Sequence, residues 1–318
     1  MKIIRGIANL KNQFSKCVVT LGNFDGVHLG HQALISRLIL QAKKRNLPTV
    51  LVLFEPQPLE FLTGDNAPSR LTSFQEKVKL IEKLGIDYLL AVPFTQTFAT
   101  LSADSFIQDW LVDRMKVDYI VVGDDFRFGS SRQGSVALLS QYASKYNFTV
   151  ESMPTFVHNH FRVSSTAVRQ ALLNNDFELA HCLLGREYTI QGRVVHGNAL
   201  ARQLGFPTAN IHLHRKKPAL HGVFFVNVRH LCTDKYYEGI ANIGMRPTIN
   251  GKSAILEVNL FDFSDTIYGE YLEVFFVEKL REEKKFSSLE TLKIQISEDI
   301  CAAKQLSVRY SSSSLGDK

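Results

Sequence analysis

The sequence predicts two domains of different class: an α/β domain built on a parallel sheet, then a small antiparallel β-barrel that ends in a helix. Three observations support this prediction. The chain has 318 residues, and about 100–200 residues make one domain. Short apolar runs alternate with helical patterns from residue 17 to about 175. Beyond about residue 185, strand-like runs follow one another without helices between them.

The alternation in the first half is typical of right-handed β–α–β units, and therefore of a parallel sheet. Ligands of such sheets bind at the carboxyl ends of the strands, so we expect chemistry in the loops that follow them. The expected strands and helices alternate in the order 17–22, 31–45, 50–54, 73–85, 88–92, 105–115, 119–122 and 136–146.

The second half contains evenly spaced strand patterns separated by Gly, Pro, Asn and Asp turns, which favours a small barrel. These patterns cover 188–195, 222–228, 235–243, 254–261 and 272–279. A helix is expected at 288–306, and a short helix at 176–184 connects the halves. We therefore expect domains at 1–183 and 184–310, with a flexible tail at 311–318.

The composition is that of an ordinary globular protein, with 45% apolar and 21% charged residues. The apolar runs are too short to cross a bilayer, and the N-terminus shows no signal-peptide pattern. The four cysteines include no C-x-x-C pair, which suits a reducing compartment. We expect a cytoplasmic protein without a membrane partner.

The net charge of +6 permits an anionic partner, either nucleic acid or a small phosphorylated ligand. The basic residues are dispersed, and no basic cluster is interleaved with aromatic side chains that would stack on bases. A basic protein whose barrel binds nucleic acid as an OB-fold does stays open as an alternative. A steep fall of binding with salt would support it.

The segment 20–31 follows the first expected strand and opens a helix, where backbone N–H groups and the helix dipole favour phosphate. Gly22 and Gly30 allow tight turns and a close approach to a ligand. His28 and His31 are three residues apart, so both rings can face one ligand and donate hydrogen bonds to ATP phosphates. A helix cap and a metal site are the alternatives, and the lack of a third ligand nearby weakens the second.

The segment Ser164-Ser165-Thr166-Ala167-Val168-Arg169 is a second expected helix start. Its hydroxyls can cap the helix or contact phosphate, and Arg169 can bind phosphates bidentately. Taken alone, this pattern is ordinary capping. The loop 123–129 follows the fourth expected strand and contains Asp125 and Phe126, with a purely structural loop as the rival interpretation.

In the second half, Gly205-Phe206-Pro207-Thr208-Ala209-Asn210 is a polar turn at the expected mouth of the barrel. Thr208 and Asn210 are two residues apart, so their side chains point the same way in an extended segment. Hydroxyl and amide oxygens suit Mg²⁺, which needs few protein ligands when phosphates complete its shell. The segment 192–197 can form a loop over ATP phosphates. An ordinary turn is the alternative.

Glu257 lies in a strand pattern, where an inward carboxylate is costly unless it is paired or functional. Such a carboxylate can accept the proton of an attacking hydroxyl, as catalytic aspartates do in other kinases. A glutamate on the solvent face of the strand is the alternative.

The N-terminal motifs together resemble those of a known enzyme family. His28-Leu29-Gly30-His31 is similar to the H-x-G-H signature of the nucleotidyltransferase superfamily, and the run 22–31 resembles in particular the bacterial bifunctional riboflavin kinase/FAD synthetase family. Ser164 to Arg169 is similar to the superfamily's S-S-T-x-x-R motif. The loop 123–129 resembles G-[DE]-N-F-x-F-G, with Asp125 where many members carry Asn.

The C-terminal half resembles a riboflavin kinase domain throughout. The matching segments are 205–210, 222–224, 239–244, 246–248, Glu257 with 261–263, and 281–286. Asn259 stands where many members have His. The resemblance covers nearly the whole chain, and it implies a Rossmann-like nucleotidyltransferase domain followed by a six-stranded barrel with a terminal helix.

The resemblance also implies two activities: ATP-dependent phosphorylation of riboflavin to FMN in the C-terminal domain, and adenylylation of FMN to FAD with release of pyrophosphate in the N-terminal domain. The implied partners are riboflavin, FMN and ATP, with Mg²⁺ at Thr208 and Asn210 and no nucleic acid. We expect a monomer or weak homo-oligomer. The implied catalytic residues are Glu257, His28 and His31. The implied flavin-binding residues are Asp125, Phe126 and Arg281. The implied nucleotide-binding residues are Gly22, Phe24, Asp25, Gly30, Ser164, Ser165, Thr166, Arg169, Gly197, Thr208 and Asn210.

Two other enzymatic interpretations stay open. One activity can have been lost, and Asp125 is the residue that keeps this possibility open. A different nucleotidyltransferase, making a cytidylyl or another adenylyl product, is the second, which the kinase-like half disfavours.

Overall fold

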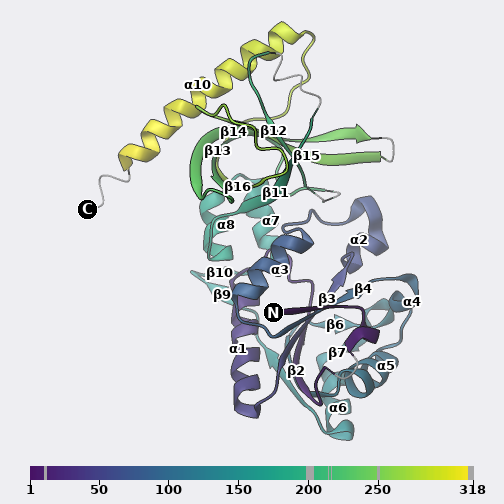
Figure 1. Cartoon of the computed structure of the whole chain (residues 1–318). Helices are drawn as coiled ribbons and strands as arrows, with labels where there is room; N and C mark the ends of the chain where they lie inside the picture. The colour runs from purple at the N-terminus through teal and green to yellow at the C-terminus, as the bar shows by residue number, and fades with distance from the viewer. Residues whose placement is uncertain (11–12, 198–203, 214, 216, 249–250, 314–318) are drawn as a thin grey trace. The chain divides into compact units, whose positions relative to one another are not determined.

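The computed structural model describes residues 1–10, 13–197, 204–213, 215, 217–248 and 251–313 (Figure 1). The chain forms two compact units, residues 1–68 with 74–167 and residues 69–73 with 168–318. Residues 168–183, which the sequence analysis assigns to the first domain, group with the second unit. The exact domain boundary stays a prediction.

The first unit is built on a six-stranded parallel sheet with the strand order β1-β4-β3-β2-β5-β8. The strands are β1 (Lys2–Arg5), β2 (Cys17–Leu21), β3 (Thr49–Glu55), β4 (Tyr88–Pro93), β5 (Val117–Gly123) and β8 (Thr149–Met153). The prediction of a parallel α/β domain is therefore confirmed. The sequence patterns missed β1 and β8, which are the two edge strands and lack the continuous buried run of the central ones.

Helices cover both faces of this sheet, because successive residues of each strand point to opposite sides. Val18 packs with Ile35 and Leu38 of α1 (Leu29–Arg45), whereas Val19 packs with the cluster that contains Ile107 and Leu111. The remaining helices of the unit are η1 (Ile7–Leu10), α2 (Pro58–Thr63), η2 (Gly64–Asn66), α3 (Phe74–Lys83), α4 (Gln96–Ala99), α5 (Ala103–Ser105), the π-helix η3 (Phe106–Arg114), η4 (Ser130–Arg132) and α6 (Val136–Tyr146). Two short hairpins complete it, β6 (Arg127–Phe128) with β7 (Gly134–Ser135) and β9 (Val157–His158) with β10 (Phe161–Arg162).

The second unit is a closed six-stranded antiparallel barrel with the order β11-β12-β15-β14-β13-β16, as expected. Its strands are β11 (Thr189–Val195), β12 (Ala209–His212), β13 (Gly222–His230), β14 (Lys235–Thr248), β15 (Gly251–Leu260) and β16 (Tyr271–Arg281). The strand patterns missed β12, which has only four residues. Two helices precede the barrel, α7 (Ser165–Leu173) and α8 (Phe177–Leu184).

The terminal helix α10 (Leu289–Ser313) follows the barrel and is longer than the sequence predicts. Its Ala303 is fully buried against Phe225 and Ile240 of the barrel. A flexible tail is expected from residue 311, and Ser311 to Ser313 still belong to this helix, so the flexibility of the segment stays a prediction. Residues 314–318 lie outside the described part of the chain. Within the described residues, we find no helix long and apolar enough to span a bilayer.

Two candidate active sites

A cavity of about 300 Å³ lies in the first unit at the carboxyl ends of β2, β5 and β8, where a parallel sheet binds its ligands. Leu21, Gly123 and Met153 mark these strand ends in its wall. The cavity brings together many of the residues predicted from sequence, namely Gly22, Phe24, His28, Gly30, His31, Asp125, Phe126, Ser164 and Ser165.

The loop between β2 and α1 holds two non-glycine residues in the left-handed region, Phe24 at φ 48° and Val27 at φ 44°. Such positions cost of order 1–3 kcal/mol each and cluster at functional sites. Side-chain hydrogen bonds to three carbonyls fix the loop: Lys77 Nζ donates to Asn23 at 2.7 Å, Ser165 Oγ to Asp25 at 2.8 Å and Gln32 Nε2 to Val27 at 2.9 Å. The loop is therefore held in one conformation at the wall of the cavity.

His28 and His31 lie with their rings stacked, 3.6 Å between centroids and 15° between planes. His28 Nδ1 accepts a hydrogen bond from the His31 backbone N–H at 3.2 Å, so His28 is the N-cap of α1. The cap alternative is thus correct for His28, and the same ring also lines the cavity. Because Nδ1 is the acceptor, a neutral His28 carries its proton on Nε2.

Burial, with further contributions from His28 and Lys77, holds the pKa of His31 well below its usual range. His31 is therefore neutral at pH 7 and offers one N–H donor. Its Nδ1 is buried and has no hydrogen-bond partner among the residues that the structure describes. A buried polar atom of this kind in a cavity wall is a ready contact for a polar ligand.

Three predicted nucleotide-binding residues are not among the described residues that line this cavity. Among the described residues that line the cavity, neither Asp25 nor Thr166 occurs. Asp25 is buried at 2% exposure, and its backbone carbonyl is what Ser165 contacts. Arg169 groups with the second unit, where its Nε donates to the Ser69 carbonyl. Their roles in nucleotide binding stay predictions.

Sequence reasoning missed two cations at this site. Lys77 is fully buried on α3 and anchors the strained loop. The sequence feature that points to Lys77 is its position on the apolar face of the expected helix 73–85. Arg162 lines the cavity and pairs with Asp125, with 3.8 Å between Nη2 and Oδ2. Nothing in the sequence near Arg162 indicates this pairing.

In the second unit, Thr208 and Asn210 line two cavities at once. The first, of about 170 Å³, also contains Glu257 and Arg281 in its wall. The second, of about 310 Å³, contains Gly197. Thr208 and Asn210, whose side chains offer oxygen atoms as ligands, therefore lie between the cavity that contains Glu257 and the cavity that contains Gly197.

The barrel register places Asn210 opposite Glu257, and Glu257 opposite Asn242. Directly opposed residues share a face of the sheet, so these three side chains are neighbours. The Oδ1 atoms of Asn210 and Asn242 are buried and have no hydrogen-bond partner within the described chain. Amide oxygens left in this way beside a carboxylate fit a hard divalent cation. Asn242 was not predicted from the sequence, because only the strand pairing brings it to the site.

Neighbouring residues hold the Thr208–Asn210 segment in place. Asn210 Nδ2 donates to the Thr208 carbonyl at 3.3 Å, and Asn259 Nδ2 donates to the Pro207 carbonyl at 2.8 Å. A Cβ on Gly197 would lie 2.3 Å from Asn210 Nδ2, so a larger residue at this position would displace the Asn210 amide. The expected loop 192–197 is wrong in part, because Gly192 to Val195 belong to β11.

Arg281 lines the smaller cavity, but its guanidinium is held by Asp299 of α10, with 2.7 Å from Nη2 to Oδ2. Its Nε donates to the same carboxylate at 2.8 Å. The structure thus shows a link between β16 and α10, and the flavin-binding role stays a prediction.

Comparison with known proteins agrees with the division of the chain into two parts, each with its own candidate site. Residues 10–167 match the FAD synthetase family model, and residues 184–307 match the riboflavin kinase family model. The chain is 47% identical over 304 residues to the bifunctional riboflavin kinase/FMN adenylyltransferase of Haemophilus influenzae, covering 96% of this chain and 98% of that one. The chain belongs to this bifunctional family. The Escherichia coli K12 enzyme of the same name is also 47% identical, over 306 residues, covering 96% of this chain and 97% of that one.

A solved structure described as a macrolide-efflux protein from Streptococcus pneumoniae is also similar, with a TM-score of 0.75 and 30% identity. The match covers 96% of this chain and 99% of that chain, so the likeness extends over both units.

Proposed function

We propose that this member of the family carries both activities: it phosphorylates riboflavin to FMN in its second unit and adenylylates FMN to FAD in its first, with ATP as the donor in both steps. The observation that supports the proposal is that the two sets of motif residues lie in different compact units. The H-x-G-H residues line a cavity of one compact unit, and Thr208, Asn210 and Glu257 line cavities of the other.

For the kinase step, riboflavin occupies the cavity beside Glu257 and the ATP phosphates occupy the cavity beside Gly197. Glu257 accepts the proton of the ribityl 5′-hydroxyl, whose oxygen attacks the γ-phosphorus while the bond to ADP breaks. Asn259 and Gly197 position Thr208 and Asn210 at the point where the two cavities meet. Thr208 and Asn210 would hold Mg²⁺, which offsets the phosphate charge when bound.

For the adenylyl step, a phosphate oxygen of FMN attacks the α-phosphorus of ATP, and pyrophosphate leaves. The FMN phosphate is already ionised near neutral pH, so the site needs hydrogen-bond donors rather than a base. Neutral His31 offers one ring N–H, and His28, whose Nδ1 accepts the cap hydrogen bond, offers Nε2–H. The backbone N–H groups at the start of α7, beside Ser164 and Ser165, add a positive dipole end.

Each cavity is lined by residues of a single unit. The proposed chemistry therefore needs no second copy of the chain, which supports a monomer or weak homo-oligomer. Sedimentation of the purified protein across a range of concentrations measures this state directly.

The test of function is a time course with purified protein, riboflavin, ATP and Mg²⁺, with the flavins separated by chromatography. We expect FMN to appear first and FAD to follow. A parallel reaction that starts from FMN isolates the second step, and a reaction without ATP is the control. FMN without FAD would overturn the adenylyltransferase assignment, and absence of both products would overturn the proposal as a whole.

A further inference from the structure

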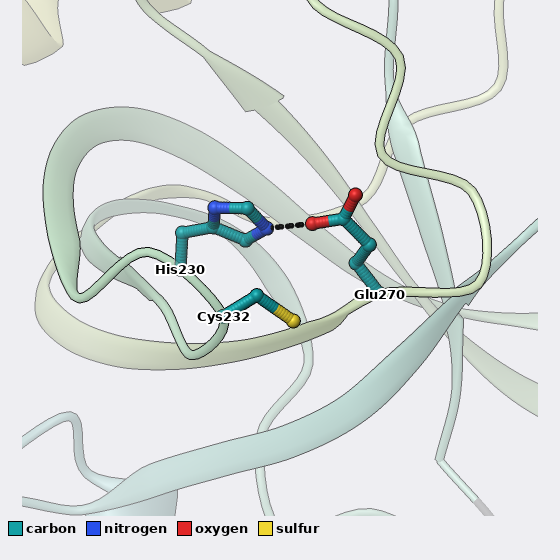
Figure 2. Close-up of side chains that lie close together, drawn as sticks. All are labelled: His230, Cys232 and Glu270. Carbon is teal, nitrogen blue, oxygen red and sulfur yellow. Dashed lines mark hydrogen bonds and ion pairs between the residues drawn. The ribbon is translucent and has the colours of Figure 1, made fainter.

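Three side chains that commonly bind metals converge at the turn between β13 and β14 (Figure 2). His230 ends β13, Cys232 lies in the turn, and Glu270 directly precedes β16. One ligand atom from each lies within 4.8 Å of the other two. Within the described part of the chain, no other group of three His, Cys, Asp or Glu side chains converges in this way.

The backbone fixes these positions without help from a ligand. The Leu231 N–H donates to the Tyr271 carbonyl at 3.0 Å, which ties the turn to the start of β16. The Asp234 N–H donates to the His230 carbonyl at 2.8 Å and closes the turn. The three ligand-bearing residues are therefore brought together by main-chain hydrogen bonds.

The ring of His230 is also oriented. It is buried at 5% exposure, and its Nδ1 lies 2.7 Å from Thr233 Oγ1, while its Nε2 is hydrogen-bonded to the Glu270 carboxylate (Figure 2). In the metal-free protein, Nε2–H donates to the Glu270 carboxylate. When a bound metal displaces this proton, Nδ1–H donates to Thr233 and the Nε2 lone pair faces the cluster. A second hydrogen bond of this type orients most histidines that bind metals.

We propose that His230 Nε2, Cys232 Sγ and the Glu270 carboxylate bind Zn²⁺, with water as the fourth ligand. Imidazole, thiolate and carboxylate together suit Zn²⁺, whereas Mg²⁺ prefers oxygen ligands alone. Bond lengths of about 2.0–2.3 Å place the ligand atoms of a tetrahedral zinc site roughly 3.3–3.6 Å apart. Cys232 is exposed and Glu270 is half-buried, so both side chains can move the short distance required.

This site is separate from the proposed Mg²⁺ site. Val223, near the start of β13, lines the cavity of Glu257, and His230 lies seven residues further along the same strand. Seven residues of a strand span about 23 Å. Bound Zn²⁺ would cross-link the β13–β14 turn to the start of β16, and so would act as a clamp on the barrel rather than as part of phosphoryl transfer.

The test is a titration of the metal-free full-length protein with Co²⁺, which reports a coordinated thiolate through a charge-transfer band. We expect one equivalent of Co²⁺ to produce the band and Zn²⁺ to abolish it by displacement. Cys232→Ser should lose the band, and Cys301→Ser, which removes another exposed cysteine, should keep it. Competition with a chromophoric chelator should show Zn²⁺ affinity lowered more than about tenfold in Cys232→Ser and in Glu270→Gln.

Thermal unfolding gives a second readout. Zn²⁺ should raise the melting temperature of the wild type but not of Cys232→Ser, because a ligand stabilises only the state that binds it. Cys232→Ser without zinc should form FMN at the wild-type rate, which shows that the variant is folded. The proposal is overturned if the wild type gives no thiolate band, or if the band persists in Cys232→Ser.

Discussion

At the residue scale, the stacked pair His28–His31 combines a structural and a chemical role. His28 caps α1 through Nδ1 and lines the cavity of the first unit. His28→Asn separates the two roles, because asparagine is a good N-cap but lacks the ring N–H. We expect FAD formation from FMN to fall by about 10²–10³-fold, as for loss of one transition-state donor.

The measurement for His28→Asn is the initial rate of each reaction, assayed separately by chromatography. FMN formation from riboflavin should be unchanged, and the free energy of unfolding should change by less than about 1 kcal/mol. His160→Ala, which removes an exposed histidine, is the matched control and should change neither initial rate. An equal loss of both activities in His28→Asn would contradict the assignment.

His31 gives a prediction about pH. Its pKa lies well below the usual value of 6.5 in the folded protein, so the unfolded chain binds its proton at a higher pH. The contribution of neutral His31 to the free energy of unfolding is then fully present above about pH 6.5, and it is lost as the pH falls below this value. Unfolding by urea between pH 7.5 and 5 should show this loss, and His31→Gln should show less of it. The same pH dependence in both proteins would contradict the account.

Asp125 places a carboxylate in a cavity proposed to bind phosphates, where Arg162 offsets its charge. Both side chains are largely exposed, so their interaction is worth less than about 1 kcal/mol. We therefore expect Asp125→Asn to lower the KM of the adenylyl step by about two- to fivefold, with kinase kinetics unchanged. A raised KM would show instead that the carboxylate contacts the substrate.

Most residues predicted from motifs line one of the cavities, because local spacing places a whole loop, whereas Asp25, Thr166 and Arg169 are not among the described lining residues. Lys77 and Asn242 were missed for a different reason. Each is an ordinary polar residue in its own segment, and only tertiary packing makes one a buried anchor and the other a neighbour of Glu257. Such contacts come from elements far apart in the sequence, where periodicity carries no information.

At the element scale, the central strands of the sheet and five of the barrel strands follow from apolar patterning and turn residues. The patterns failed at β1, β8 and β12. The first two are partly exposed edges, and β12 is four residues long, so none has the long apolar run by which a strand is recognised. The six-stranded count came from the family resemblance rather than from the strand patterns.

The link between β16 and α10 provides a test of stability. Arg281 and Asp299 are largely buried and bonded through two guanidinium nitrogens. Asp299→Leu leaves the guanidinium buried without its partner, so we expect a loss of about 3–5 kcal/mol in the free energy of unfolding. The double variant Arg281→Met with Asp299→Leu should recover much of this loss.

Denaturant unfolding of the wild type, the single variant and the double variant measures this coupling. A loss below about 1 kcal/mol in Asp299→Leu would show that the pair is solvated and contributes little. Recovery of kinase activity in the double variant would also show that Arg281 is a structural link rather than a flavin ligand.

At the scale of the whole molecule, the central claim is that two independent sites act in sequence. Each candidate cavity is lined within one compact unit, and each family model matches one part of the chain. A variant that blocks one site should therefore leave the other intact. Glu257→Gln should slow FMN formation by about 10²–10⁴-fold, as for loss of a general base, and leave the conversion of FMN to FAD unchanged.

The most direct measurement mixes two variants, Glu257→Gln and His28→Asn, with riboflavin, ATP and Mg²⁺. Alone, Glu257→Gln should leave riboflavin unconverted, and His28→Asn should stop at FMN. Together they should make FAD, because FMN released by one variant is adenylylated by the other. A mixture that accumulates FMN but no FAD, although Glu257→Gln converts added FMN to FAD, would contradict free exchange between independent sites. Failure of Glu257→Gln to convert added FMN would contradict the assignment of the two reactions to separate units.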